Sequence, residues 1–141
     1  MRISARNILA GAVRSVDKGK VIAIVKVELK SGNVISSIIT NDSVDRLGLK
    51  PGVDAYVIVK ASSVMIGNGG SDLKLSARNI VKGTIKKIKE GMVMAEIVLD
   101  IGNGGTISAT ISDESTKKLG LKEGEEALAV FKATSVMIGV E

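Results

Sequence analysis

The stretch "ISARNIL" (Ile3–Leu9) returns almost unchanged as "LSARNIV" (Leu75–Val81), and this repeat decides how the chain is organised. Sliding the 141-residue sequence against itself by roughly 72 positions aligns residues 1–69 with 73–141 without a gap, and about 27 of about 69 positions match. The other identical blocks are "LGLK" (Leu47–Lys50 and Leu119–Lys122), Lys60-Ala61 with Lys132-Ala133, and "SVMIG" (Ser63–Gly67 and Ser135–Gly139). The sequence therefore predicts a duplicated unit.

The duplication predicts two small domains. The first unit is expected over residues 1–67 and the second over residues 73–141, with the polar, Gly-rich segment "NGGSD" (68–72) as the linker. A unit of this length buries only about 60% of the surface of its unfolded chain, so it should be marginally stable alone. We therefore expect units, and also chains, to pair with one another.

Each unit shows the hydrophobic pattern of five strands. Apolar residues alternate or run together in short segments rich in Val and Ile, and glycine turns bound these segments. In the first unit the strands are expected from Ile3 to about Val16, at "VIAIVKVEL" (21–29), at "VISSIIT" (34–40), through Ala55–Lys60 and at "SVMIG", which completes the unit. The second unit repeats the pattern.

One short helix is expected in each unit, at Asp42–Leu47 and at Asp113–Leu119. Thr40 and Ser112 can cap the helix starts, and a glycine follows each helix and can end it. Five strands and one short helix in a unit of this length match the small Greek-key barrel. The predicted fold class is all-β, with two tandem OB-like five-stranded barrels that each carry one short helix.

The composition excludes several classes of function. The chain has no cysteine and no histidine, which rules out disulfides, thiolate or imidazole metal sites, and Ser-His or Cys-His catalysis. We therefore expect no catalytic residues, no catalytic cofactor and no site for a metal cation. The 20 Lys and Arg residues against 15 Asp and Glu residues leave a net charge of +5, which suits an anionic partner.

The sequence shows no signal for export or for a membrane. Residues 1–10 lack the basic region, apolar core and cleavage site of a signal peptide. The longest apolar stretch, "VIAIVKVEL", is too short to span a bilayer and contains Lys26 and Glu28. A cytoplasmic protein without a membrane partner is therefore expected.

Hydroxyl and cationic residues repeat together at two places in each unit. Because alternate residues of a strand share a face, Ser4 and Arg6 should point the same way, and so should Lys60 and Ser62. The second unit repeats these pairs as Ser76 with Arg78 and Lys132 with Thr134. A hydroxyl beside a cation suits a small oxyanion, because the hydroxyl donates a hydrogen bond and the cation offsets the charge.

The same residues also have purely structural interpretations. A Ser-x-Arg pattern on a strand is more often a solvated face or a cross-strand pair, and a lysine at a strand end often serves solubility. Thr40 and Ser112 are most simply helix caps, although a helix N-terminus also favours an anion. The residues alone leave both interpretations open.

Three ordered motifs resemble the Mop domain of the molbindins: "SARNILAGAV" (4–13), "IITNDSVDRLGLKPG" (38–52) and "VKASSVMIG" (59–67). The resemblance covers both units, so the chain looks like a di-Mop molbindin. It implies OB-like units, assembly of the chains as a homotrimer, and molybdate or tungstate held at interfaces between units. It also implies a cytoplasmic protein that acts in storage or homeostasis of the oxyanion.

The resemblance further implies which residues hold the oxyanion. They lie on the opening motif, before the short helix and on the closing motif, and the two alanines offer only backbone N–H groups. They are Ser4, Arg6, Thr40, Lys60, Ala61 and Ser62, and in the second unit Ser76, Arg78, Ser112, Lys132, Ala133 and Thr134. A second kind of oxyanion site, lined by backbone near symmetry axes, is expected at Gly19, Lys20 and Val21 and at Gly91, Met92 and Val93.

Binding of single-stranded nucleic acid is the alternative function, because OB barrels often bind single strands and the chain is basic. Such sites normally stack bases on aromatic side chains. Tyr56 and Phe131 are the only Tyr and Phe of the chain, and they occupy non-equivalent positions of the two units. We therefore expect an oxyanion, and no nucleic acid, as the ligand.

Overall fold

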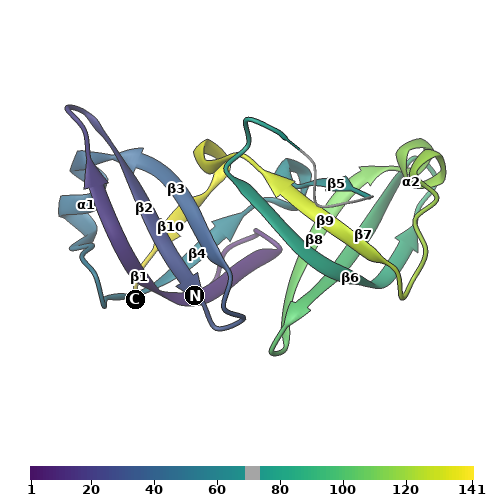
Figure 1. The fold of residues 1–141 in the computed structure, drawn as a ribbon, viewed down its shortest axis with the longest axis horizontal. Coiled ribbons are helices and arrows are strands. Elements are labelled where there is room, and N and C mark those ends of the chain that lie inside the picture. The colour runs from purple at the N-terminus through teal and green to yellow at the C-terminus, as the bar shows by residue number, and fades with distance from the viewer. Residues whose placement is uncertain (69–73) are drawn as a thin grey trace.

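The computed structural model describes residues 1–68 and 74–141, so all of the predicted linker except Asn68 lies outside the described residues. Two five-stranded sheets lie side by side, each with a short helix at its outer end (Figure 1). The first repeat forms β1 (Asn7–Lys18), β2 (Ile22–Leu29), β3 (Val34–Thr40), α1 (Asn41–Leu47), β4 (Asp54–Val59), the 3-10 turn η1 (Ala61–Ser63) and β5 (Met65–Gly67). The second forms β6 (Asn79–Glu90), β7 (Met94–Gly102), β8 (Gly105–Ser112), α2 (Asp113–Leu119), β9 (Glu126–Phe131), η2 (Ala133–Ser135) and β10 (Met137–Gly139).

The all-β class and the five strands and one helix expected for each repeat are confirmed. Burial follows the period of two that a half-buried strand requires. On β2 the residues Ala23, Val25, Val27 and Leu29 point into the core, and the matching positions of β7 do the same. No helix among the described residues is long and apolar enough to cross a membrane.

The first strand of each repeat is long and bends, which curls its sheet. The pairing of β1 with β2 shifts between Val13 and Ser15, as expected for a β-bulge, and β6 has the same shift against β7. Near the bend β1 and β2 approach one another so closely that glycine is required, because a Cβ on Gly11 would clash with the carbonyl oxygen of Glu28. Gly83 has the same constraint in the second repeat.

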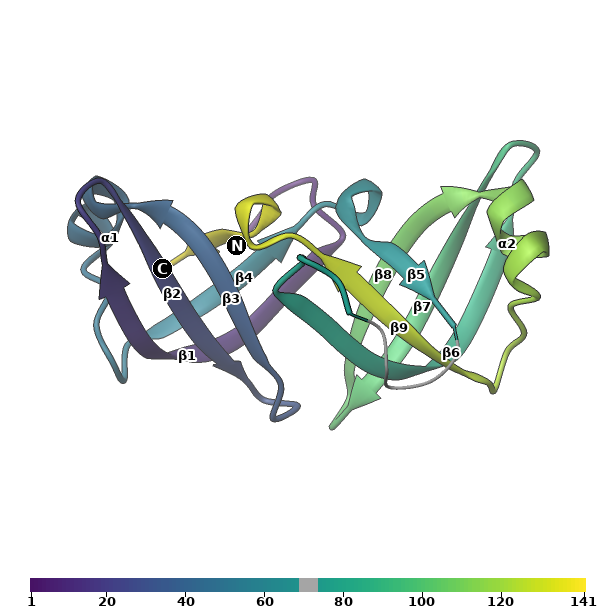
Figure 2. The ribbon, with the colours of Figure 1, turned by 45° about the horizontal axis from the view of Figure 1, so that its top comes forward.

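The last strand of each repeat joins the sheet of the other repeat. The sheet orders are β10-β4-β1-β2-β3 and β5-β9-β6-β7-β8, with Met65 opposite Val130 and Met137 opposite Ile58. Figures 1 and 2 both show β10 in the half built by the N-terminal repeat and β5 in the other half. The expectation that "SVMIG" completes its own unit is therefore wrong. Because β4 and β9 are copies of one another, the sequence pattern specifies the strand but not which of the two edges it joins.

Two buried asparagines fasten the halves together. The Asn7 side chain, 2% exposed, donates to the backbone oxygen of Ser108 at 2.8 Å and accepts from its N–H at 2.7 Å. Asn79 makes the same pair of bonds with Ser36, each 2.8 Å long. Ser108 lies on β8 and Ser36 on β3, so each amide satisfies an edge strand of the opposite sheet. Each asparagine thus anchors the backbone of the other half.

Replacement of Asn7 by alanine tests this contact between the halves. Asn7→Ala should lower the free energy of unfolding by about 2–4 kcal/mol, because it leaves a partly buried N–H and C=O of Ser108 without partners. Urea denaturation measures the change. Asn33→Ala is the matched control, since that amide donates to the hydroxyl of Ser31, two residues away in the same turn. Equal losses in the two variants would contradict the assigned role.

Candidate functional site

Two equivalent pockets lie where the halves meet, and each is named here by its arginine. The Arg6 pocket has a volume of about 300 Å³ and the Arg78 pocket about 380 Å³. The Arg6 pocket is lined by Ile3, Ser4, Ala5, Arg6, Lys60, Ala61, Ser62, Thr110 and Met137. The Arg78 pocket is lined by Ile38, Met65, Leu75, Ser76, Ala77, Arg78, Lys132, Ala133 and Thr134.

Each pocket gathers five of the residues predicted from the repeated motifs. Ser4 and Arg6 come from the segment before β1, and they meet the closing motif of the same repeat at η1. Ser76 and Arg78 meet the motif at η2 in the same way. The opening and closing motifs, more than fifty residues apart in each repeat, thus form one wall of each pocket.

The local backbone at these residues differs from the expected strand. β1 begins only at Asn7, and β4 ends at Val59, so neither Ser4 with Arg6 nor Lys60 with Ser62 shares a strand face. The chain instead turns at η1, where buried Ala61 fixes the turn and Ser62 is exposed. The first N–H groups of a helical turn have no partner within it, which leaves those of Ala61 and Ser62 available to a ligand.

The opposite wall of each pocket comes from the other repeat. Thr110 of β8 and Met137 complete the Arg6 pocket, whereas Ile38 of β3 and Met65 complete the Arg78 pocket. Sequence reasoning missed these four residues, because only the docking of the two repeats and the exchange of β5 and β10 bring them to the site. The repeated sequence contains one indication that the two walls differ, since Thr110 and Ile38 occupy equivalent positions and differ in polarity.

The charged groups of the two pockets have different neighbours. Arg6 Nη1 lies 2.5 Å from Oε2 of Glu96, which belongs to β7 of the other repeat. Within the part of the chain that the structure describes, Lys60, Arg78 and Lys132 form no ion pair. Three cations thus keep their charge available for a ligand, and one shares it with a carboxylate.

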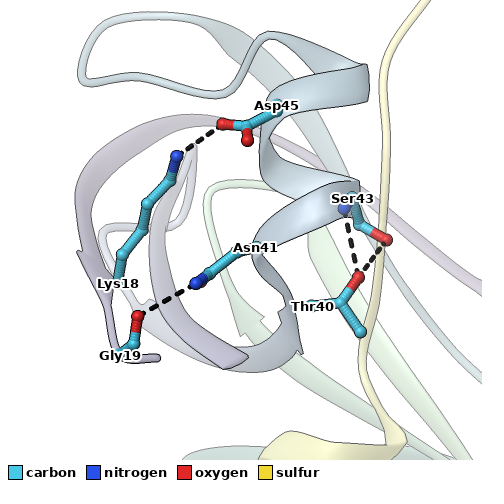
Figure 3. A network of polar contacts seen from close by, with 6 residues as sticks. All are labelled: Lys18, Gly19, Thr40, Asn41, Ser43 and Asp45. Atoms are coloured by element: carbon cyan, nitrogen blue, oxygen red, sulfur yellow. Dashed lines mark hydrogen bonds and ion pairs between the residues drawn. The ribbon is translucent and has the colours of Figure 1, made fainter. Parts of the chain in front are cut away.

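Thr40 and Ser112 lie outside both pockets and cap the helices. The Thr40 hydroxyl accepts from the Ser43 N–H at 3.1 Å, as Figure 3 shows, and Ser112 accepts from the Ser115 N–H at 3.0 Å. The structure therefore does not bring these two predicted residues to the others within one chain. Their capping interpretation, which the sequence left open, is correct.

The turns predicted as a second site are tied to the helix starts. The Gly19 carbonyl accepts from Asn41 Nδ2 at 2.9 Å (Figure 3), and the Asn41 N–H donates to the Val21 carbonyl at 2.8 Å. Lys20 is exposed at the tip of this turn.

The equivalent turn of the second repeat is also exposed. Met92 and Val93 are 99% and 72% exposed, and the Val93 carbonyl accepts from the Asp113 N–H. Gly91 borders a cavity that also contacts Arg6, so this turn adjoins the Arg6 pocket.

A further cavity, of about 560 Å³, is lined by none of the predicted oxyanion-binding residues. It contains the carboxylates of Glu28, Asp54 and Glu141 against one lysine, Lys30. The negative charge of Glu141 raises the pKa of Tyr56, which lines the same cavity. The amino group of Met1 pairs with Glu141 at 3.1 Å and Arg14 pairs with Glu28 at 3.8 Å, so the charges around this cavity are balanced and provide no excess of positive charge for an anion.

The geometry defines a class of protein: a duplicated OB-like module whose halves exchange strands and form a pair of small, cationic pockets at their junction. The TOBE domain family matches residues 3–66 and 75–138, so the chain belongs to the TOBE domain family and carries two consecutive copies of the domain.

Several relatives are named for molybdenum. The molybdenum-pterin-binding protein MopA of Rhodobacter capsulatus is 39% identical over 140 residues, which are 99% of this chain and 53% of that protein. The molybdenum transport protein ModE of Azotobacter vinelandii is also 39% identical, over 99% of this chain and 52% of its own length. The chain thus spans about half the length of these curated relatives. A probable molybdenum-pterin-binding protein of Haemophilus influenzae is 49% identical over 69 residues, 49% of this chain and all of that protein.

A solved structure matches the chain over its whole length. It is ModG, described as a cytoplasmic molybdate-binding protein and solved with molybdate bound. The TM-score is 0.96 with 39% identity, and the match covers 100% of both chains. The resemblance to tandem Mop proteins inferred from the motifs is confirmed.

Replacement of Thr40 separates capping from other roles of this residue. Thr40→Ala should lower the free energy of unfolding by about 1 kcal/mol, because the Ser43 N–H loses its acceptor. Thr40→Asn should retain most of the stability, since asparagine also caps helices well. Denaturation by guanidinium chloride measures both, and a loss as large in Thr40→Asn as in Thr40→Ala would contradict the cap.

Proposed function

We propose that this protein binds molybdate or tungstate reversibly in the cytoplasm, for storage or homeostasis, and that it performs no catalysis. The observation that carries the proposal is the meeting of hydroxyl, cation and backbone N–H groups from the two repeated motifs in each pocket. The names of the relatives support the choice of ligand, because MopA is described as molybdenum-pterin-binding and ModG as molybdate-binding.

The chemistry of the pockets fits a small tetrahedral dianion. Removing such an ion from water is costly unless several donors and positive charges replace its hydration. The Arg78 pocket offers the hydroxyls of Ser76 and Thr134, the cations Arg78 and Lys132, and the backbone N–H of Ala133. Hydrogen bonds to a charged acceptor are the strong ones, so this set suits an oxyanion better than a neutral ligand.

The chains of this protein should assemble, and we propose a homotrimer. Large apolar side chains are exposed at equivalent places of the two repeats, including Val21 and Ile22 in one and Met92, Val93 and Met94 in the other. Repeated exposed apolar clusters are typical of interaction surfaces. In such an assembly, Thr40, Ser112 and the turns at Gly19–Val21 and Gly91–Val93 could contribute to oxyanion sites of a neighbouring copy.

Nucleic acid is the less suitable ligand. Phe131 is fully buried in the core, so its ring is not available to stack on a base. Tyr56 lines a cavity whose cations are matched by three carboxylates, so its ring does not lie in the positively charged groove that single-stranded nucleic acid requires.

Ligand-dependent stability tests the proposed function. Molybdate at a hundredfold excess over its dissociation constant should raise the free energy of unfolding by about 2.7 kcal/mol per site. Thermal denaturation and titration calorimetry measure this, with phosphate as the comparison anion. Arg78→Ala with Lys132→Ala should abolish the effect at that pocket, while Lys82→Ala, which removes an exposed cation outside both pockets, should not. No shift at millimolar molybdate or tungstate would overturn the proposal.

Native mass spectrometry tests the assembly. The expected spectrum shows three chains with bound oxyanion ions in one particle. Val93→Glu should weaken the assembly, because it places a charge in an exposed apolar cluster, without changing the buried core. A particle of one chain that retains full molybdate binding would contradict the trimer.

A further inference from the structure

The two pockets differ mainly at one cross-strand pair of the wall that the other repeat supplies. On β7 and β8, Glu96 lies opposite Thr110, and this pair borders the Arg6 pocket. On β2 and β3 the equivalent pair is Ile24 opposite Ile38, and Ile38 lines the Arg78 pocket. The duplicated cations therefore face a polar, acidic wall in one pocket and an apolar wall in the other.

Glu96 is placed to compete with an anion for Arg6. Its side chain is only 20% exposed, and its carboxylate lies 2.5 Å from the Arg6 guanidinium, which is itself 65% exposed. An oxyanion entering this pocket either displaces the carboxylate from Arg6 or shares the cation with a like charge beside it. Both are unfavourable for a dianion, because like charges at short range repel and a charge without its partner must be solvated again.

The Arg78 pocket has no such competitor among the described residues. Its wall carries apolar Ile38 where the Arg6 pocket has Thr110, and an apolar neighbour lowers the local dielectric, which strengthens the attraction of Arg78 and Lys132 for an anion. Thr110 gives the Arg6 pocket one additional hydroxyl, but a neutral donor does not replace the unit of positive charge that Glu96 offsets.

We propose that Glu96 acts as an internal competitor, so that the two pockets of one chain bind an oxyanion with different affinity and the Arg78 pocket fills first. The inference rests on the proposed oxyanion binding. It assigns to Glu96 and Ile24 the control of affinity, although neither residue belongs to the repeated motifs. The protein would then hold one portion of its oxyanion tightly and release the other as the free concentration falls.

Calorimetric titration of the full chain with molybdate tests the inference. Two classes of site are expected, with affinities about tenfold apart. Arg78→Ala should remove the tight class, and Arg6→Ala should remove the weak class. Glu96→Gln should raise the affinity of the weak class about tenfold and leave the tight class unchanged. Ile24→Glu should lower the affinity of the tight class by a similar factor.

A matched control separates the local effect from a change in net charge. Glu126→Gln removes an exposed carboxylate that pairs with Lys82, outside both pockets, and should leave the two classes unchanged. The difference in affinity between the two classes of site should decrease as the salt concentration is raised, since salt screens the interaction between charges. Glu96→Ile places at position 96 the residue found at the equivalent position 24 of the first repeat. It should raise the affinity of the weak class as Glu96→Gln does, so the test does not depend on the folding of a single variant.

The outcomes distinguish the inference from the function on which it rests. Absence of molybdate and tungstate binding in the unaltered chain overturns the proposed function. Binding with one class of site, unchanged in Glu96→Gln and Glu96→Ile, overturns the inference alone. Weaker binding in Glu96→Gln also overturns it, because Glu96 would then hold Arg6 in place for the ligand and would not compete with it.

Discussion

The reciprocal contact between the two halves is the constraint on which the rest of the structure depends. Each half gives its last strand to the other sheet and inserts one buried asparagine amide against the other half's edge strand. Neither repeat therefore completes its own sheet, and the edge strand of each sheet receives hydrogen bonds from an asparagine of the other repeat. The pockets depend on this docking and exchange, since one wall carries the cations of one repeat and the opposite wall comes from the other repeat.

Much of the fold follows from the sequence. Alternating apolar residues indicated the strands, and the threonine and serine before each helix indicated the caps. The strand exchange could not be predicted, because "SVMIG" fits the edge of β4 and the edge of β9 equally well. Local periodicity describes which residues form a strand, whereas the choice between two equivalent edges depends on how the halves pack.

The candidate site was predicted in composition but not in geometry. The motifs indicated Ser4, Arg6, Lys60 and their copies, and these residues do meet. The supposed strand faces were wrong, since Ser4 precedes β1 and Lys60 lies between the end of β4 and the 3-10 turn η1. The residues of the opposite wall carried no motif, because their position at the site depends on contacts between segments 101 and 43 residues apart.

Duplication within one chain allows the two sites to differ, which identical chains in a symmetric pair cannot do. Ser37 donates a hydrogen bond to the Val136 carbonyl at 2.7 Å, whereas Ala109, at the equivalent position, has no hydroxyl to donate. Glu96 and Ile24 differ in the same way. Because the halves are docked reciprocally, a substitution on the wall of one repeat acts on the pocket whose cations belong to the other. The affinity of each pocket can therefore be adjusted from outside its own motif, while the motif that supplies the hydroxyls, cations and backbone N–H groups stays the same in both copies.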